Sequence, residues 1–142
     1  MAKRITVFTD GAAAPNPGPA GVGIVVLDES GKMLSQVSRN IGRATNNQAE
    51  YVAVVMALEE AARLNAEHVE VRSDSELLVR QIGGEYRVRN PVLKPLFEQV
   101  RRLMNGFASC HVVHIPREQN KAADALSRNA LHRVTRSVSN LH

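Results

Sequence analysis

Four acidic residues of this 142-residue chain stand in short polar motifs between apolar segments. Asp10 lies in Phe-Thr-Asp-Gly, Glu50 in Asn-Asn-Gln-Ala-Glu-Tyr, Asp74 in Arg-Ser-Asp-Ser, and Asp124 in Asn-Lys-Ala-Ala-Asp-Ala-Leu. Clustered carboxylates repel one another unless cations neutralise them. Their hard oxygen atoms favour Mg²⁺ or Mn²⁺, and two such ions can stabilise the attacking and leaving oxygens of a phosphoryl displacement. If the four acids meet, the chemistry they predict is that of a metal-dependent nuclease.

Each acid also has an ordinary structural explanation. Asp10 would shape a turn with the glycine that follows it, and Glu50 would close a capping box. Asp74 would cap the helix after it, and Asp124 would lie near a helix N-terminus, where the macrodipole favours negative charge. Taken singly, these roles are the commoner ones, so the chemical interpretation depends on all four acids meeting.

The elements expected along the chain can bring the acids together. Short apolar runs predict strands at 5–9, 21–27, 33–41, 68–72 and 111–115, and apolar residues at helical spacing predict helices at about 47–64, 73–82, 90–104 and 120–131. Three strands joined by short loops, then alternating helices and strands, predict an α/β fold with a mixed sheet and helices packed on it. The ends of the first and fourth strands and the starts of the first and last long helices then converge at one sheet edge.

Composition restricts the class of protein. The chain is 44% apolar and 23% charged, which is typical of globular domains, and its one cysteine cannot form an internal disulfide. No apolar run approaches the roughly 18 residues of a membrane helix, and no signal peptide precedes the first strand. We therefore expect a cytoplasmic protein with one domain, residues 1–131, and a basic, disordered tail, residues 132–142.

Charge is distributed unevenly along the chain. Residues 1–70 carry a net charge of −2 and residues 71–142 a net charge of +6. A basic half is consistent with a polyanionic partner such as nucleic acid, although an ordinary solvated surface explains the same imbalance.

Together, the motifs resemble those of ribonuclease H type 1 (ribonuclease HI) in order and spacing, over about residues 3–130. The matching segments are Phe-Thr-Asp10-Gly-Ala-Ala-Ala-Pro-Asn16, Ala-Thr45-Asn46-Asn47-Gln-Ala-Glu50-Tyr, Ser-Asp74-Ser and Pro-Arg117-Glu-Gln-Asn-Lys-Ala-Ala-Asp124. The resemblance implies a ribonuclease H-like fold with three antiparallel and two parallel strands. It also implies endonucleolytic hydrolysis of the RNA strand of RNA–DNA hybrids with little sequence specificity, leaving 3′-hydroxyl and 5′-phosphate ends; cleavage of double-stranded RNA stays open.

The resemblance also implies roles for individual residues. Two Mg²⁺ or Mn²⁺ ions would bind, with substrate present, to the catalytic acids Asp10, Glu50, Asp74 and Asp124. The backbone and 2′-hydroxyls of the hybrid would contact Asn16, Asn46 and Asn47. A phosphate of the DNA strand would contact Arg43 and Thr45. For the amides, ordinary turn and capping duty is the alternative, and for Arg43 it is plain solvent exposure.

Two departures from the family pattern point to a subgroup. Many members have a catalytic histidine in the loop before the last acid, where this chain has Arg117. His114 is a rival for that role, but it falls in a strand pattern that predicts packing. The basic protrusion of several members is also missing, because residues 83–90 are few and supply only Arg87 and Arg89. Fewer phosphate contacts should weaken hybrid binding and its salt dependence.

Two other interpretations stay open. One is a module that binds hybrid or double-stranded RNA without cleaving it, although concentrated negative charge gives a mere binder no advantage beside a polyanion. The other is a nuclease domain of a larger polyprotein, such as a reverse transcriptase. The Met1 start and the full set of elements favour a free-standing enzyme over a polyprotein domain. We also expect a monomer that does not associate with membranes.

Overall fold

The structure is a computed structural model that describes the backbone of residues 3–140 and the side chains of residues 3–131. Its elements, in chain order, are β1 (Arg4–Ala13), β2 (Gly18–Asp28), β3 (Met33–Ala44), α1 (Asn46–Arg63), β4 (His68–Ser73), α2 (Glu76–Ile82), α3 (Leu93–Met104), β5 (Ser109–His114), a 3₁₀ turn (Arg117–Gln119) and α4 (Lys121–Asn140).

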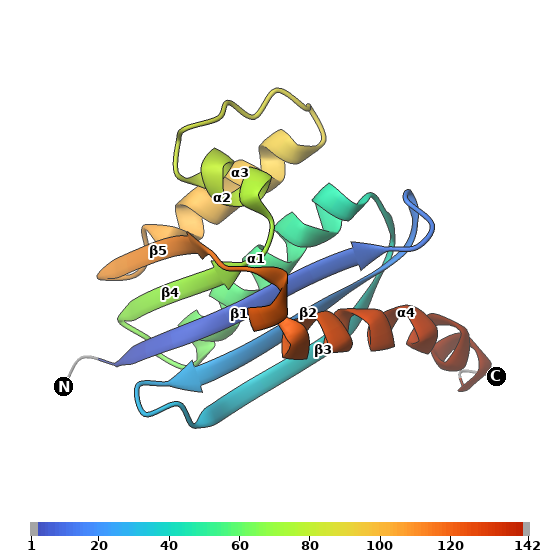
Figure 1. The fold of residues 1–142 in the computed structure, drawn as a ribbon, viewed down its shortest axis with the longest axis horizontal. Coiled ribbons are helices and arrows are strands. Elements are labelled where there is room, and N and C mark those ends of the chain that lie inside the picture. The colour runs from blue at the N-terminus through green and yellow to red at the C-terminus, as the bar shows by residue number, and fades with distance from the viewer. Residues whose placement is uncertain (1–2, 141–142) are drawn as a thin grey trace.

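The strands form one mixed sheet in the order β3-β2-β1-β4-β5. The pairs β1–β2 and β2–β3 are antiparallel, whereas β1–β4 and β4–β5 are parallel. Helix α1 packs on one face with α3 beyond it, and α4 crosses the other face over β2 and β3 (Figure 1). The expected α/β fold, with three antiparallel and two parallel strands flanked by helices, is confirmed.

The sequence pattern explains which strands lie deepest. In β1, every second residue faces α1, as the two-residue period of a strand requires. Ile5 and Val7 are two of these residues and are buried. In β2 the apolar run is continuous, because α1 covers one face of this strand and α4 the other. Strand β1 is the middle strand of the five, and its last residues lie between α1 and α4.

Some element boundaries differ from those expected. Strand β1 does not end before Asp10-Gly11 but continues to Ala13, because β2 pairs with it along this whole length, Asp10 lying opposite Gly23. Helix α2 begins three residues later than expected, at Glu76.

Helix α4 continues past the expected end near Leu131 to Asn140. The division into a domain and a disordered tail stays a prediction, because the side chains beyond Leu131 and the whole of residues 141–142 lie outside the described part. No helix within residues 3–140 has the length and apolar character needed to cross a membrane.

Candidate functional site

A cleft of about 610 Å³ opens where β1, β4, α1 and α4 meet, and all four candidate acids line it. Asp10 comes from β1, Glu50 from the first turns of α1, Asp74 from the residue after β4, and Asp124 from the first turn of α4. The chain thus brings together, from four elements, the carboxylates that the motifs singled out.

Two glycines allow the helices to come this close to the sheet. A Cβ built on Gly11 would overlap the backbone of Ala49 and Glu50, so this glycine lets α1 lie against the end of β1. A Cβ built on Gly23 would overlap the Ala123 carbonyl oxygen, so this glycine lets α4 lie directly on β2. Because Gly23 is paired with Asp10, the start of α4 is held beside that acid.

The electrostatics of the cleft centre on Asp10. Its pKa is raised from 3.8 to about 7, first by burial and then by the negative charges of the other three acids, against the lowering effect of the Ser127 hydroxyl. Burial and the charge of Asp74 also raise the pKa of Glu50, while Ser75 and Arg117 act in the opposite direction. Burial and mutual repulsion disfavour the ionised forms of these acids, and bound cations would offset both effects.

Two buried polar side chains hold the acids from behind. The Ser127 hydroxyl lies 2.5 Å from Asp10 Oδ2 and 2.9 Å from the carbonyl oxygen of Asp124. The side-chain amide of Asn120 donates to Thr9 O over 2.9 Å and to Asp74 Oδ2 over 3.0 Å. These bonds tie α4, and the turn before it, to the ends of β1 and β4.

The donor set fits a hard divalent cation. All four groups at the cleft are carboxylates, which suit Mg²⁺ or Mn²⁺, and their mutual repulsion would be relieved by bound positive charge. Within residues 3–131, no three acidic, histidine or cysteine side chains are already gathered tightly enough to hold an ion. The fit therefore rests on the chemistry of the acids and on their common cleft.

For three of the four acids, the ordinary structural role expected from the sequence is wrong. Asp10 lies within a strand and not in a turn. The capping box of α1 is formed by Thr45 and Gln48, so Glu50 takes no part in it. The cap of α2 is Ser75, whose side chain accepts from Leu78 N, so Asp74 is not a cap. Asp124 does lie in the first turn of α4, where the macrodipole favours it, and it also forms an ion pair of 3.1 Å with Arg128.

Arginine, and not histidine, accompanies the acids in the cleft. Arg117 lines the cleft from the 3₁₀ turn before α4 and is close enough for its charge to lower the pKa of Glu50. His114 is the last residue of β5, as its strand pattern predicted, but its side chain is exposed, so the expected packing is wrong. It does not line the cleft. The placement favours Arg117 over His114 as the residue that assists the acids.

The candidate substrate-binding residues extend the cleft on the side of α1. Asn46 lines the cleft; its Oδ1 accepts from Ala13 N over 2.7 Å, and its own backbone N–H donates to Asn16 Oδ1 over 3.0 Å. Thr45 precedes it as the cap of α1, and Asn47 follows it with an exposed side chain. Arg43 is exposed on β3, where it pairs with the cleft residue Pro19. Of the five residues, Asn46 alone lines the cleft, and the other four adjoin it through the chain, a hydrogen bond or strand pairing; we call this set the strip beside α1. Asn16 and Asn46 also have structural duties there.

The segment between α2 and α3 spans residues 83–92 and contains no helix. Tyr86 in this segment is 48% exposed, with the Arg80 guanidinium 5.5 Å from the centre of its ring. Arg80 of α2 also forms an ion pair of 3.6 Å with Glu85 of this segment. The segment is therefore a compact loop held by local contacts.

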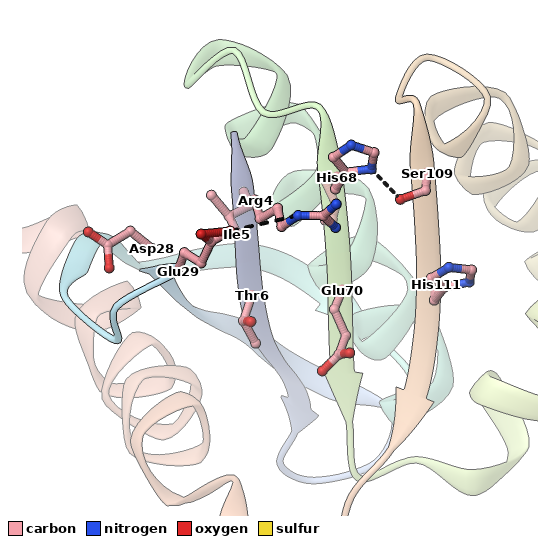
Figure 2. Close-up of a pocket in the computed structure, with 10 residues that line it drawn as sticks. Arg4, Ile5, Thr6, Asp28, Glu29, His68, Glu70, Ser109 and His111 are labelled. Atoms are coloured by element: carbon pink, nitrogen blue, oxygen red, sulfur yellow. Dashed lines mark hydrogen bonds and ion pairs between the residues drawn. The ribbon is translucent and has the colours of Figure 1, made fainter. Parts of the chain in front are cut away.

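A second, smaller hollow of about 280 Å³ lies at the opposite end of the sheet, over the first residues of β1, β4 and β5 (Figure 2). Its polar groups are engaged with one another: Arg4 forms an ion pair of 3.7 Å with Glu29, and His68 Nδ1 lies 2.7 Å from Ser109 Oγ. Glu70 is paired with Arg72. The third acid of its lining, Asp28, accepts hydrogen bonds from Ser30 N and Lys32 N, so each acid of this hollow has a local partner.

Sequence reasoning missed Ser127, Asn120, Arg128 and the two spacing glycines. The glycines had a signal: Gly23 interrupts an apolar strand, where glycine often marks a close approach of another backbone. Ser127 follows Asp124 by three residues, one helical turn, a spacing that puts two side chains on the same face of a helix. Nothing in the sequence showed that this face meets Asp10.

Residues 8–130 match the protein family described as reverse transcriptase-like. The chain is 41% identical over 128 residues to ribonuclease HI of Halobacterium salinarum, covering 90% of this chain and 64% of that protein. The crystal structure of ribonuclease H1 from that archaeon superimposes with a TM-score of 0.89 over 91% of this chain and 98% of the other.

Two further similar proteins are also ribonucleases H by name. The chain is 32% identical to ribonuclease H of Syntrophus aciditrophicus, over 93% of this chain and 83% of that protein. It is 42% identical, with a TM-score of 0.87 over 92% of this chain and 99% of the other, to LC11-RNase H1 crystallised with an RNA/DNA hybrid. The chain spans only 64% of the Halobacterium relative and 38% of some other curated relatives.

Proposed function

This chain belongs to the ribonuclease H family, and from that membership we propose that it hydrolyses the RNA strand of RNA–DNA hybrids as a divalent-metal-dependent endonuclease. The observation that carries the proposal is the meeting of Asp10, Glu50, Asp74 and Asp124 in one cleft. The raised pKa of Asp10 supports it, because a structural acid gains nothing from three neighbouring carboxylates.

Asp10, Glu50, Asp74 and Asp124 would hold two Mg²⁺ or Mn²⁺ ions when substrate is bound, with Asp10 the most central of the four ligands. Bound there, the metal would supply Lewis acidity for hydrolysis of the phosphodiester by water, which leaves 3′-hydroxyl and 5′-phosphate ends. The protein keeps the acids in place through the glycine contacts and through the bonds of Ser127 and Asn120.

Arg117 takes the place of the loop histidine in this mechanism. A guanidinium stays charged throughout the working pH range, so it cannot transfer a proton as an imidazole does. Its charge at the cleft instead stabilises the phosphate under attack and assists release of the product. This role puts the chain in the subgroup that has arginine at this position and lacks the basic protrusion.

The strip beside α1 binds the hybrid. Asn16, Asn46 and Asn47 contact the backbone and the 2′-hydroxyls, which distinguish RNA from DNA because they both donate and accept hydrogen bonds. Arg43 and Thr45 bind a phosphate of the DNA strand, a charge-assisted contact that positions the duplex without reading its sequence. The LC11 relative crystallised with a hybrid supports this partner. The enzyme acts as a monomer in the cytoplasm with little sequence preference.

Cleavage of end-labelled duplexes, resolved on a denaturing gel, tests the proposal. An RNA–DNA hybrid, double-stranded RNA, double-stranded DNA and single-stranded RNA are each incubated with Mg²⁺, Mn²⁺ or EDTA. We expect metal-dependent cutting of the RNA strand of the hybrid at many positions, and the double-stranded RNA lane defines the substrate range. Tight binding of the hybrid without cutting in either metal would instead favour a binding module.

A further inference from the structure

We propose that Ser127 is a positioning residue for the metal site: its hydroxyl holds one carboxylate oxygen of Asp10 and thereby offers the other to a divalent cation. The inference rests on the proposed function, because it concerns how the same cleft binds its ions. Nothing in the motif pattern assigns a role to this serine.

The contacts come from two distant parts of the chain. Ser127 Oγ lies 2.5 Å from Asp10 Oδ2, although the two residues are 117 positions apart. It also lies 2.9 Å from the carbonyl oxygen of Asp124, one turn earlier in α4. A single hydroxyl therefore links the central acid of the cleft to the backbone of another acid.

Burial makes this contact specific. Ser127 is 0% exposed, so no bulk water competes with Asp10 for its proton. A serine inside a helix commonly donates its hydroxyl proton to the carbonyl three or four residues earlier, which here is Asp124 O at 2.9 Å. The single proton of this hydroxyl is shared with Asp10 Oδ2, the closer acceptor at 2.5 Å, so its effect falls on the carboxylate.

The backbone around Ser127 fixes the geometry. Gly23 pairs with Asp10, and a Cβ on Gly23 would come within 2.7 Å of Ser127 N, so helix and strand are as close as backbones allow. Neither end of the bond can then move away independently. A carboxylate held at Oδ2 from inside the protein presents Oδ1 to the cleft, which is the arrangement that a metal ligand needs.

Mg²⁺ binding to the free protein tests this, without any cleavage reaction. MgCl₂ is titrated into wild type, Ser127→Ala, Asp10→Asn and the double variant, and dissociation constants are taken from the amide chemical shifts. Ser127→Ala should weaken Mg²⁺ binding about tenfold, as is usual when the hydrogen-bond partner of a metal ligand is removed. In the Asp10→Asn background the same substitution should have no further effect, because Ser127 acts through Asp10.

Ser38→Ala is the matched control. Ser38 lies on β3 and donates to Leu126 O of the same helix over 2.6 Å, but it does not line the cleft. It should leave the Mg²⁺ dissociation constant unchanged, and the amide spectra report whether each variant is folded. A Ser38→Ala effect as large as that of Ser127→Ala would overturn the inference, since it would trace both effects to the seating of α4.

The outcomes separate the inference from the proposed function. If Asp10→Asn weakens Mg²⁺ binding and Ser127→Ala does not, the positioning role is wrong and the proposed function stands. If Ser127→Ala weakens binding by the same factor with and without Asp10, its effect does not pass through that carboxylate and the inference also fails. If Asp10→Asn leaves Mg²⁺ binding unchanged, the proposed metal site itself is wrong.

Discussion

The side-chain amide of Asn120 donates to Asp74 Oδ2 over 3.0 Å from a position that is only 1% exposed. The same nitrogen donates to Thr9 O over 2.9 Å, so one amide connects Thr9, inside β1, with Asp74, the residue after β4. The spacing between Asp10, which follows Thr9, and Asp74 is thereby fixed by a residue outside the acidic set.

Replacing this amide should cost stability. Asn120→Ala removes two buried hydrogen bonds and leaves the Thr9 carbonyl without its donor, so we expect the free energy of unfolding to fall by about 2–3 kcal/mol. Urea unfolding followed by circular dichroism measures the loss. Asn47→Ala, which truncates an exposed asparagine, is the control and should change stability by less than about 0.5 kcal/mol. Equal stability of both variants would show that the Asn120 bonds contribute nothing.

The close approach of α4 to β2 should tolerate no added methyl group. Gly23→Ala places a Cβ where the Ala123 carbonyl oxygen lies, so backbone must move, and we expect a loss of about 3 kcal/mol together with reduced cleavage. Gly106→Ala is the control, because the heavy atom nearest to its added Cβ, Leu103 O, is 3.3 Å away, against 2.0 Å for Ala123 O at Gly23. Thermal unfolding of the two variants distinguishes the sites, and a Gly23→Ala protein as stable as wild type would refute the packing argument.

The raised pKa of Asp10 predicts how the stability of the metal-free protein depends on pH. The folded protein holds a proton on Asp10 up to a pKa of about 7, whereas the unfolded chain loses it near 3.8. The folded state therefore binds the extra proton between these values, and this group lowers stability as the pH rises from about 4 to 7. The full penalty, about 2–4 kcal/mol, is present above pH 7.

Urea unfolding in EDTA at pH 5 and pH 8 measures this dependence in wild type and Asp10→Asn. The substitution should stabilise the protein at pH 8 and flatten the difference between the two pH values. Mg²⁺ should stabilise wild type at pH 8 by binding the ionised acids. Identical pH dependence in both proteins would mean that Asp10 titrates normally.

Arg117 should matter for turnover more than for binding. Arg117→Ala removes a charge that lines the cleft, so we expect kcat to fall about tenfold or more while KM changes little. His114→Ala is the control, because His114 does not line the cleft and should leave both constants unchanged. A larger loss in His114→Ala than in Arg117→Ala would reverse the assignment.

The sequence was sufficient for the fold and for the acids, and insufficient for the residues that support them. The change from a two-residue to a helical apolar period predicted the mixed sheet, and the four acids stood out because each lies in a short polar motif between apolar segments. Asp10 was nevertheless expected in a turn, since Asp-Gly is a local turn signal; pairing with β2, a non-local contact, keeps it in the strand instead.

Ser127 and Asn120 illustrate the limit of sequence reasoning. Serine and asparagine in a helix or just before it are ordinary caps or surface residues in a sequence, and only the three-dimensional structure shows them 0% and 1% exposed and bonded to acids more than forty positions away. Burial of a polar group depends on which helix face meets the sheet, and that in turn depends on the glycines of β2.

Comparison of wild type with Asp10→Asn in cleavage and binding tests the central claim most directly. Single-turnover cleavage of a labelled RNA–DNA hybrid in Mg²⁺ is measured beside binding of the same hybrid in EDTA. We predict that Asp10→Asn abolishes cleavage and binds the hybrid at least as tightly as wild type, because a metal ligand and a negative charge are lost together while the binding strip is untouched. Cleavage by Asp10→Asn at the wild-type rate would contradict the account, and so would loss of hybrid binding in a folded protein.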